Sequence, residues 1–337
     1  MMRLIGLFFA LMALMPLLNS ASALPLEQTA IGAKTMRDDV FPRPPIPFPD
    51  GVVAYPDVEY SNLMGYRPLL LDIYLQKKSA APRPLVVWIH GGGWSRGDSR
   101  TSGAIVDFPA TLAALAARGY VVASVNYRLS GEARFPAQIQ DVKAAIQFLR
   151  ANAGKYNIDP ARALVWGGSA GGHLAALAAT TCGMAEFAPE PNTGRLTRAE
   201  ALAAAKTPAG SNCVQAAVIW YGIFDVARLP SPNVGSLMAC DIKACEAEMA
   251  KASPITHVTA ATPPMLLVHG LADTEVPVTQ SQQMAARMKQ AGAPVETLFI
   301  PDADHGLIGK TPQASRAATL QALHRTFDYI DAFFAKK

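Results

Sequence analysis

Short, nearly continuous apolar runs recur along the chain from about residue 84 onward. Buried parallel strands have this pattern because helices cover both of their faces. Two earlier segments, 52–60 and 69–75, mix apolar and polar positions and predict an antiparallel hairpin at a sheet edge. The runs that predict buried strands are 84–90, 120–126, 163–166, 216–221, 265–269 and 295–300.

Segments with helical periodicity lie between these runs and supply the crossovers that parallel strands require. They are 103–118, 135–153, 170–181, 279–292 and 314–335. The alternation predicts one α/β domain over 54–337, with a mostly parallel, twisted sheet of about eight strands and helices on both faces. Two stretches rich in Ala, Pro, Thr and Ser, 183–212 and 226–262, are predicted as insertions at strand ends, where such folds keep their sites.

The N-terminal residues have the pattern of a secretory signal peptide, which we expect to span 1–23. Arg3 precedes an apolar stretch, and the small residues Ala21, Ser22 and Ala23 follow it. The stretch is shorter than the roughly 20 residues of a membrane-spanning helix. We therefore expect a periplasmic or secreted protein without a membrane anchor after cleavage. Residues 24–53 are rich in proline and predict an extended arm.

The net charge and the cysteines indicate which binding partners and which covalent links to expect. The net charge of +4 is spread without a basic cluster, so nucleic acid is not an expected partner. An even number of cysteines in an exported protein favours disulfides. We favour the local pairing because each pair brackets a segment poor in periodicity. A zinc site is the alternative, but no C-x-x-C or neighbouring His supports it. The acyl transfer predicted below requires neither a metal nor an organic cofactor. The expected pairs are Cys182 with Cys213 and Cys240 with Cys245.

A Gly-Gly-Ser-Ala-Gly sequence at 167–171 lies between a predicted strand and a predicted helix. The letters alone are a weak signal, but this position is that of a nucleophile elbow. A sharp turn with small neighbours lifts the serine hydroxyl out of the backbone, and the helix N-terminus faces developing negative charge. Ser169 is therefore the candidate nucleophile.

The sequence His90-Gly-Gly-Gly-Trp94 closes the first buried strand. Consecutive glycines let a loop turn its backbone N–H groups toward a cavity, as an oxyanion hole requires. A phosphate-binding glycine loop is the alternative, but the Lys-Ser/Thr or the G-x-G-x-x-G continuation that such loops have is absent. The pattern therefore predicts an oxyanion loop.

The base and its orienting acid should follow the serine in the order acid, then histidine. Of the four downstream histidines, His269 lies in a strand, His324 in the last helix and His257 in an insertion. His305, in a loop after a strand, remains as the candidate base.

Asp273 is the favoured acid because it lies in a turn directly after a strand. Glu275 is its close neighbour and stays an alternative. Asp302 and Asp304 share the loop of His305 and would have to fold back to reach its ring.

Together these motifs resemble the hormone-sensitive-lipase-like esterases of the α/β-hydrolase superfamily and, more closely, the bacterial esterases related to feruloyl and acetyl-xylan esterases. The resemblance covers about residues 65–335. It implies oxyanion donors from the backbones of Gly92, Gly93 and Ala170, with His90 and Asp98 bracing that loop. One departure is the proline-rich arm, which stands where many relatives have a helical cap.

The resemblance and the residues predict a serine hydrolase that cleaves carboxylic esters through an acyl-enzyme. The expected substrates are small-molecule or polysaccharide-linked esters with short or aromatic acyl groups, because the arm and residues 195–206 offer little apolar surface for a long channel. Trp94, Trp220 and Tyr221 are candidate aromatic faces beside the site, although a core position suits them equally.

Three other functions stay open at this point. A peptidase of the same fold is the first, although such enzymes usually carry a large additional domain, which does not fit into the 314 residues after the expected signal peptide. An arylformamidase-like amide hydrolase has similar motifs, although export argues against an intracellular catabolic step. A catalytically inactive binding protein on the same fold is the third alternative, and the filled triad positions argue against it.

Overall fold

The computed structural model describes residues 44–77, 81–193, 210–229, 231–240 and 245–335. These ranges belong to one unit, Pro42–Lys337. The predicted signal peptide and the first part of the proline-rich arm lie outside the described residues, as do 194–209 of the first insertion.

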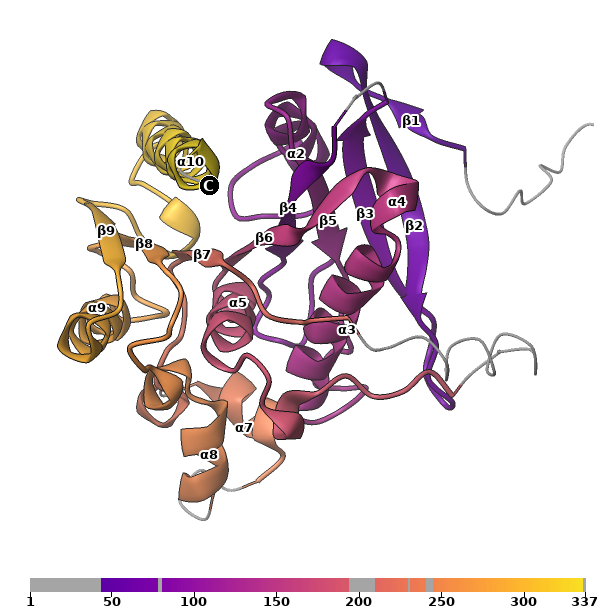
Figure 1. Cartoon of the computed structure of the whole chain (residues 1–337). Coiled ribbons are helices and arrows are strands. Elements are labelled where there is room, and N and C mark those ends of the chain that lie inside the picture. Colours follow the sequence, from indigo (N-terminus) through magenta and orange to yellow (C-terminus); the bar gives the residue numbers. More distant parts are fainter. Residues whose placement is uncertain (1–43, 78–80, 194–209, 230, 241–244, 336–337) are drawn as a thin grey trace, which may run out of the picture. The chain divides into compact units, whose positions relative to one another are not determined.

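Within these ranges, nine strands form one sheet in the order β1-β2-β3-β5-β4-β6-β7-β8-β9 (Figure 1). The strands from β1 to β5 in this order pair antiparallel, and the neighbours from β5 to β9 pair parallel. The additional strand relative to the prediction is the two-residue β1 in the proline-rich arm. The strands are β1 (Ile46–Pro47), β2 (Val52–Ser61), β3 (Leu69–Gln76), β4 (Arg83–Ile89), β5 (Val121–Val125), β6 (Ile158–Gly168), β7 (Ala216–Trp220), β8 (Met265–Gly270) and β9 (Val295–Ile300).

Helices cover both faces of the sheet and enclose two hydrophobic cores (Figure 1). The core on one face contains side chains of α3 (Ala137–Ala151), α4 (Ala153–Tyr156), α5 (Ala170–Thr180) and α9 (Thr279–Ala291). The core on the other face contains side chains of α2 (Phe108–Ala117) and α10 (Pro312–Ala335). Strand residues alternate between these cores, because successive side chains point to opposite faces.

The second insertion folds over the first of these faces. Its elements are η4 (Val226–Arg228), α7 (Pro232–Met238), α8 (Glu246–Ala252) and η6 (Pro254–His257). The Val226 N–H donates to Ser253 Oγ at 2.9 Å, which joins the start of the insertion to its end. The Phe135 N–H donates to the Leu237 carbonyl at 3.0 Å, which ties α7 to the loop before α3. The first insertion contributes η3 (Ala185–Phe187).

The cysteines pair locally, as the sequence predicts. Cys182 is joined to Cys213 with Cα atoms 4.8 Å apart. Cys240 is joined to Cys245 with Cα atoms 6.3 Å apart. The second pair lies between the end of α7 and the start of α8.

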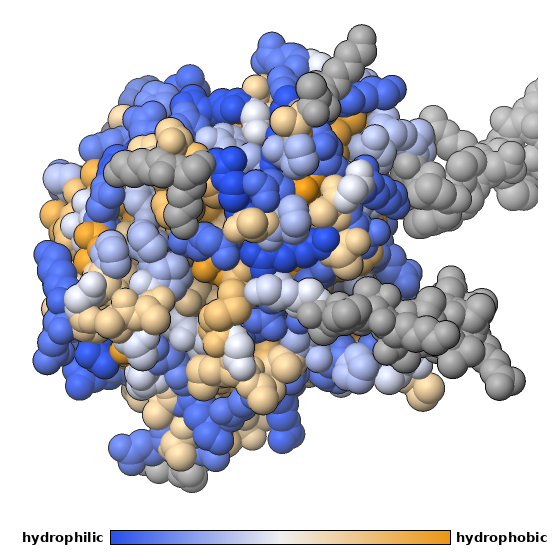
Figure 2. Space-filling view, viewed as in Figure 1, coloured by the Kyte–Doolittle hydropathy of each residue, from blue (hydrophilic) through white to orange (hydrophobic). Residues whose placement is uncertain are grey.

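The surface is mainly polar on the face shown in Figure 2, where hydrophobic residues are scattered among hydrophilic ones. In the part of the chain that the structure describes, every helix is too short or too polar to traverse a bilayer.

Candidate active site

Ser169 lies at the turn between β6 and α5, with φ 56° and ψ −123°. This left-handed φ is uncommon for a residue with a side chain. The turn is tight because its glycines pack against backbone: a Cβ on Gly167 would lie 2.3 Å from the Gly171 carbonyl oxygen, and one on Gly171 would lie 2.0 Å from that of Ile89. The glycines of the motif therefore let α5 begin directly above the sheet, and the hydroxyl of Ser169 lines a cavity.

His305 and Asp273 meet Ser169 from two neighbouring loops. Nε2 of His305 lies 2.9 Å from Ser169 Oγ. Nδ1 of His305 lies 2.9 Å from Asp273 Oδ2. Asp273 follows β8, and His305 is the first residue of η7 (His305–Leu307) after β9, so the paired strands bring the two residues together. The three candidates chosen from sequence thus form one hydrogen-bonded chain.

The Asp273 carboxylate is fully buried and well supplied with donors. Its Oδ1 accepts from the N–H groups of Glu275 at 3.0 Å and Val276 at 2.8 Å. Burial alone raises the pKa of Asp273, but hydrogen bonds from His269 and His305, aided by the Val276 N–H, outweigh burial and hold that pKa well below its usual range. The carboxylate is therefore ionised and available to orient the ring of His305.

His269 contacts Asp273, whereas its place inside a strand predicts only a structural role. Its Nε2 lies 3.1 Å from Asp273 Oδ2 and 2.9 Å from the Val276 carbonyl oxygen, and its Nδ1 lies 2.7 Å from Ser281 Oγ. The ring is therefore locked between α9 and the turn that carries the acid. A spacing of four residues across a strand end is the only signal of this contact in the sequence.

The other acid candidates lie elsewhere. Asp304 accepts from the N–H groups of His305 at 2.7 Å and Thr274 at 2.8 Å, so its carboxylate faces backbone rather than the imidazole. Glu275 has an exposed side chain whose Oε2 lies 3.9 Å from Nε2 of His305, the wrong ring nitrogen for an orienting acid. The Asp302 side chain is exposed, and its Oδ1 lies 3.7 Å from Nζ of Lys310. Geometry therefore selects Asp273.

The predicted oxyanion loop lines the same cavity as Ser169. Gly92 has φ 105° and Gly93 has φ 59°, which glycine adopts readily. No described residue accepts a hydrogen bond from the N–H of Gly92 or Gly93. Ala170 is the first residue of α5, where N–H groups have no acceptor within the helix. Gly92 and Gly93 thus line the same cavity as Ser169, and Ala170 follows Ser169 directly in the chain.

His90 and its neighbours hold this loop in shape. The ring of His90 stacks on the ring of Tyr127, with the two ring centroids 4.4 Å apart. The Tyr127 hydroxyl donates to the His90 carbonyl oxygen at 3.0 Å. Burial lowers the pKa of His90 to about 4, so the neutral ring can donate from Nδ1 to the Gly91 carbonyl oxygen, 2.7 Å away. Asp98 accepts from the Arg100 N–H at 2.7 Å and so fixes the following turn.

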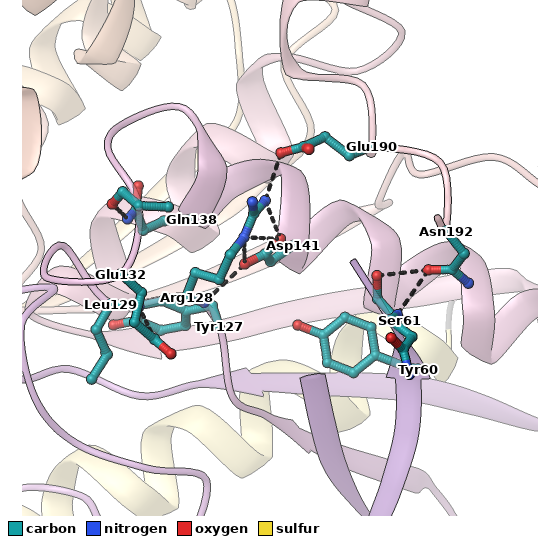
Figure 3. Close-up of polar contacts among 12 residues, drawn as sticks. Tyr60, Ser61, Tyr127, Arg128, Leu129, Glu132, Gln138, Asp141, Glu190 and Asn192 are labelled. Atoms are coloured by element: carbon teal, nitrogen blue, oxygen red, sulfur yellow. Dashed lines mark hydrogen bonds and ion pairs between the residues drawn. The ribbon is translucent and has the colours of Figure 1, made fainter. Parts of the chain in front are cut away.

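Figure 3 shows a buried ion pair between Arg128 and Asp141, with Glu190 also in contact with Arg128. Arg128 and Asp141 are both almost fully buried, and Nη2 of Arg128 lies 2.7 Å from Asp141 Oδ1 and 2.8 Å from Glu190 Oε1. The loop that begins with this arginine reaches the site, since the Ser130 N–H donates to the Trp94 carbonyl at 2.8 Å. The pair thus anchors a segment that contacts the oxyanion loop.

Asp141→Asn is expected to lower the free energy of unfolding by about 3 kcal/mol, because it leaves the buried Arg128 guanidinium with only the partly exposed Glu190 carboxylate as a counter-ion. Glu190→Gln is the matched control, and we expect it to cost no more than about 1 kcal/mol, because the Glu190 side chain is 43% exposed. Urea unfolding of both variants measures the difference. Equal stabilities would show that the buried pair is not the anchor.

The three aromatic candidates have different positions. Tyr221 lines the cavity, and its ring meets the ring of His305 edge-on at 4.9 Å. Trp94 also lines the cavity, with its indole N–H donating to Nδ1 of His173 at 3.2 Å. Trp220 lies in the core, where its indole N–H donates to Thr326 Oγ1 at 2.9 Å. The sequence prediction of Trp220 as a substrate-binding residue is therefore not supported, because its side chain points to the face that α10 covers.

The cavity has a volume of about 630 Å³. Besides Ser169, His305 and the oxyanion loop, residues of the second insertion line it, among them Leu229 and Asn233. Sequence reasoning placed an insertion here without singling out these side chains. Within the described ranges, no group of three or more His, Cys, Asp or Glu side chains is arranged to hold a metal ion.

Comparison with known proteins places this geometry in a family. Residues 71–288 match the model of the BD-FAE family. The chain belongs to the BD-FAE family. It is 32% identical over 248 residues to esterase LipC and 30% identical over 287 residues to the probable carboxylic ester hydrolase LipM, both of Mycobacterium tuberculosis. These matches cover 70% and 81% of this chain, and 56% and 60% of the respective relatives, so the chain spans less than two thirds of their length.

Solved structures agree with the sequence relatives. A truncated carbohydrate esterase from gut microbiota superposes with a TM-score of 0.69 at 28% identity, over 85% of this chain and 98% of that one. A Thermogutta terrifontis esterase solved with propionate bound superposes with a TM-score of 0.62 at 25% identity. The match covers 82% of this chain and 93% of that one. The predicted α/β-hydrolase fold is thus confirmed, and the BD-FAE chain resembles esterases in both sequence and fold.

Proposed function

We propose that this BD-FAE protein is a carboxylic-ester hydrolase in which Ser169, His305 and Asp273 form the catalytic triad. The observation that carries the proposal is the chain of two 2.9 Å contacts from Ser169 through His305 to Asp273. An ionised, buried acid on Nδ1 and a serine hydroxyl on Nε2 are the two contacts that a general base in acyl transfer needs.

The proposed reaction has two similar steps. Nε2 of His305 removes the proton of Ser169 as Oγ attacks the ester carbonyl carbon, and the imidazolium then gives this proton to the departing alcohol. Water next attacks the acyl-enzyme with the same base, and the acid product leaves. Asp273 stays ionised throughout and stabilises the imidazolium through Nδ1.

The oxyanion formed in each step is assigned to the backbone N–H groups of Gly92, Gly93 and Ala170. Each such donor contributes about 3 kcal/mol to transition-state stabilisation in enzymes of this type. Two observations support this assignment: Gly92 and Gly93 line the same cavity as Ser169, and no described residue accepts from their N–H groups.

The substrate is proposed to carry a short or aromatic acyl group. Leu229, Pro232 and Asn233 of the second insertion are among the residues that line the cavity. The volume of about 630 Å³ suits a small ester. Similarity to a carbohydrate esterase and to an esterase that binds propionate supports the same choice.

On one leaving group, kcat/KM is expected to be highest for short acyl chains and to fall beyond about eight carbons, because polar residues such as Ser102, Thr274 and Asn233 interrupt the apolar lining that a long chain needs. The measurement is a series of aryl esters from acetyl to palmitoyl, with methyl ferulate and acetylated xylan alongside. A rise in kcat/KM that continues to palmitoyl would contradict the proposed acyl preference without touching the triad.

A further inference from the structure

A second pocket contains none of the residues that line the cavity around Ser169. Its volume is about 450 Å³. Most of it is formed by residues between 128 and 140, in the loop after β5 and the start of α3. Figure 3 shows part of this region around Arg128. We call the pocket the side groove and define it by the polar side chains that line it: Tyr66, Arg128, Glu132, Arg134, Gln140 and Glu190.

The side groove has one aromatic ring, which its neighbours hold in place. Cζ of Arg128 lies 4.9 Å from the centroid of the Tyr66 ring. The Tyr66 N–H donates to the Leu63 carbonyl at 3.2 Å, and the next residue, Arg67, is paired with Glu132 at 2.7 Å. Tyr66 is nevertheless 39% exposed, so part of its ring is open to a ligand. A tyrosine ring offers a flat apolar body with a polar tip, which suits the C–H face and the hydroxyls of a sugar ring.

Three polar side chains of the side groove have hydrogen-bonding capacity left. Oε1 of Glu190 lies 2.8 Å from Nη2 of Arg128, and its Oε2 has no partner among the described residues. Within the same ranges, the side chains of Arg134 and Gln140 form no hydrogen bond or ion pair. The Glu190 side chain is 43% exposed, Arg134 is exposed and Gln140 is partly exposed. A ligand in the groove can therefore reach all three.

The charges of the side groove are balanced, with two arginines and two glutamates in its lining. A carboxylate or phosphate ligand would approach the two glutamates, and an ammonium group would approach the two arginines. A hydroxyl group avoids both costs, because it donates to a carboxylate or an amide oxygen and accepts from a guanidinium or an amide N–H. The groove therefore suits an uncharged ligand with several hydroxyls and an apolar face, as a neutral sugar chain has.

One loop borders both the side groove and the cavity around Ser169. It begins at Arg128 in the groove, and its Ser130 N–H donates to the carbonyl of Trp94, which lines the cavity, at 2.8 Å. A sugar chain held in the groove is therefore kept near the nucleophile.

We propose that the side groove is an accessory saccharide-binding site, where Tyr66, Arg134 and Gln140 hold an uncharged sugar segment of an ester-bearing polysaccharide away from the bond that is cut. Its effect on turnover rests on the proposed ester hydrolysis, whereas the binding of sugar does not. A second contact of this kind raises the effective concentration of the attached esters at the active site, without any new contact to the ester itself.

The direct test needs no catalysis. Native gels that contain deacetylated xylan without uronic acid groups are expected to retard the wild-type protein relative to gels without xylan. Tyr66→Ala, Arg134→Ala and Gln140→Ala should each raise the apparent dissociation constant about tenfold, as the loss of one well-made contact does. Arg134 and Gln140 have no partner to lose, so their variants keep the fold. Gln313→Ala and Arg316→Ala, exposed on α10 and outside the groove, are the matched controls and should migrate as the wild type does.

Steady-state kinetics give a second readout. On acetylated xylan, the three groove variants are expected to raise KM about tenfold with kcat unchanged, because they remove the contact that raises the effective concentration of esters. On an aryl acetate, which has no sugar chain to place in the groove, kcat and KM should equal those of the wild type.

The outcomes separate the accessory site from the hydrolysis. A wild-type protein that xylan does not retard, or equal retardation of all variants, overturns the accessory site and leaves the ester hydrolase standing. An equal loss on the aryl acetate and on xylan would show that the groove residues act through the fold, and it also overturns the site. Retardation that depends on Tyr66, Arg134 and Gln140 in a protein that cleaves neither substrate supports the site and overturns the proposed hydrolysis.

Discussion

Ser169→Ala is expected to reduce kcat for ester hydrolysis by about 10⁶, to the small rate that binding and the oxyanion loop sustain without a nucleophile. The variant keeps the fold, because Ala fits the space of Ser and the backbone of the turn is held by the Ser169 N–H donating to the Trp220 carbonyl at 2.9 Å. Steady-state rates on an aryl acetate measure the loss. Ser236→Ala, on the outer surface of α7, is the control and should match the wild type.

Residual activity within about tenfold of the wild type would contradict the assignment, since no other described serine shares a hydrogen bond with His305. A loss of activity together with a loss of stability would be separated by urea unfolding, which should give the same midpoint for Ser169→Ala and the wild type.

Asp273→Asn is expected to lower kcat by about 10⁴ with little change in KM, because an amide presents the wrong partner to Nδ1 and no longer stabilises the imidazolium. Asp304→Asn is the matched variant. Its carboxylate caps the backbone of Thr274 and His305 and does not reach the ring, so we expect a much smaller loss. A greater loss of kcat in Asp304→Asn than in Asp273→Asn would show that Asp273 is not the orienting acid.

His269 also affects the pKa of the Asp273 carboxyl group. Its contact with Asp273 helps hold the pKa of that carboxyl well below its usual range, together with His305. A depressed carboxyl pKa contributes stability that is present above the ordinary pKa of Asp and is lost as pH falls through the lowered value. The acid therefore stays ionised throughout the range in which ester hydrolysis is assayed.

The buried strands were predictable because both of their faces are covered. Runs such as 216–221 and 265–269 need apolar residues at every position, and the structure has strands at both places. β6 was predicted only from 163 because its first part, Asp159 to Arg162, is partly exposed and polar. A strand that projects beyond the helices lacks the signal of two-sided burial.

The start of α2 shows a different limit. Helical periodicity predicts a helix from 103, whereas α2 begins at Phe108 after Asp107, whose side chain accepts from the Ala110 N–H at 3.0 Å. Gly103 has φ 49°, which no helix tolerates. The segment before the cap is instead the loop that brings Ser102 to the cavity. Periodicity alone did not reveal that a capping residue excluded these positions from the helix.

The contacts that join Ser169, His305 and Asp273 were predictable, because each of these residues follows a strand and the chain order is fixed by the fold. The aromatic neighbours were not. Trp220 ends β7 with its side chain toward α10, and Tyr221 turns at a positive φ into the cavity. Which of two adjacent aromatic residues faces the site depends on the residue at which the strand ends, and the apolar run 216–221 includes both.

The central claim is that Ser169 is the nucleophile of an acyl-transfer triad. The most direct measurement is reaction of the purified protein with a fluorophosphonate probe, followed by peptide mapping of the labelled residue. The account predicts a single adduct on Ser169 in the wild type. It predicts much slower labelling of Asp273→Asn and no labelling of Ser169→Ala. An adduct on any other residue, or equal labelling of Ser169→Ala, would contradict it.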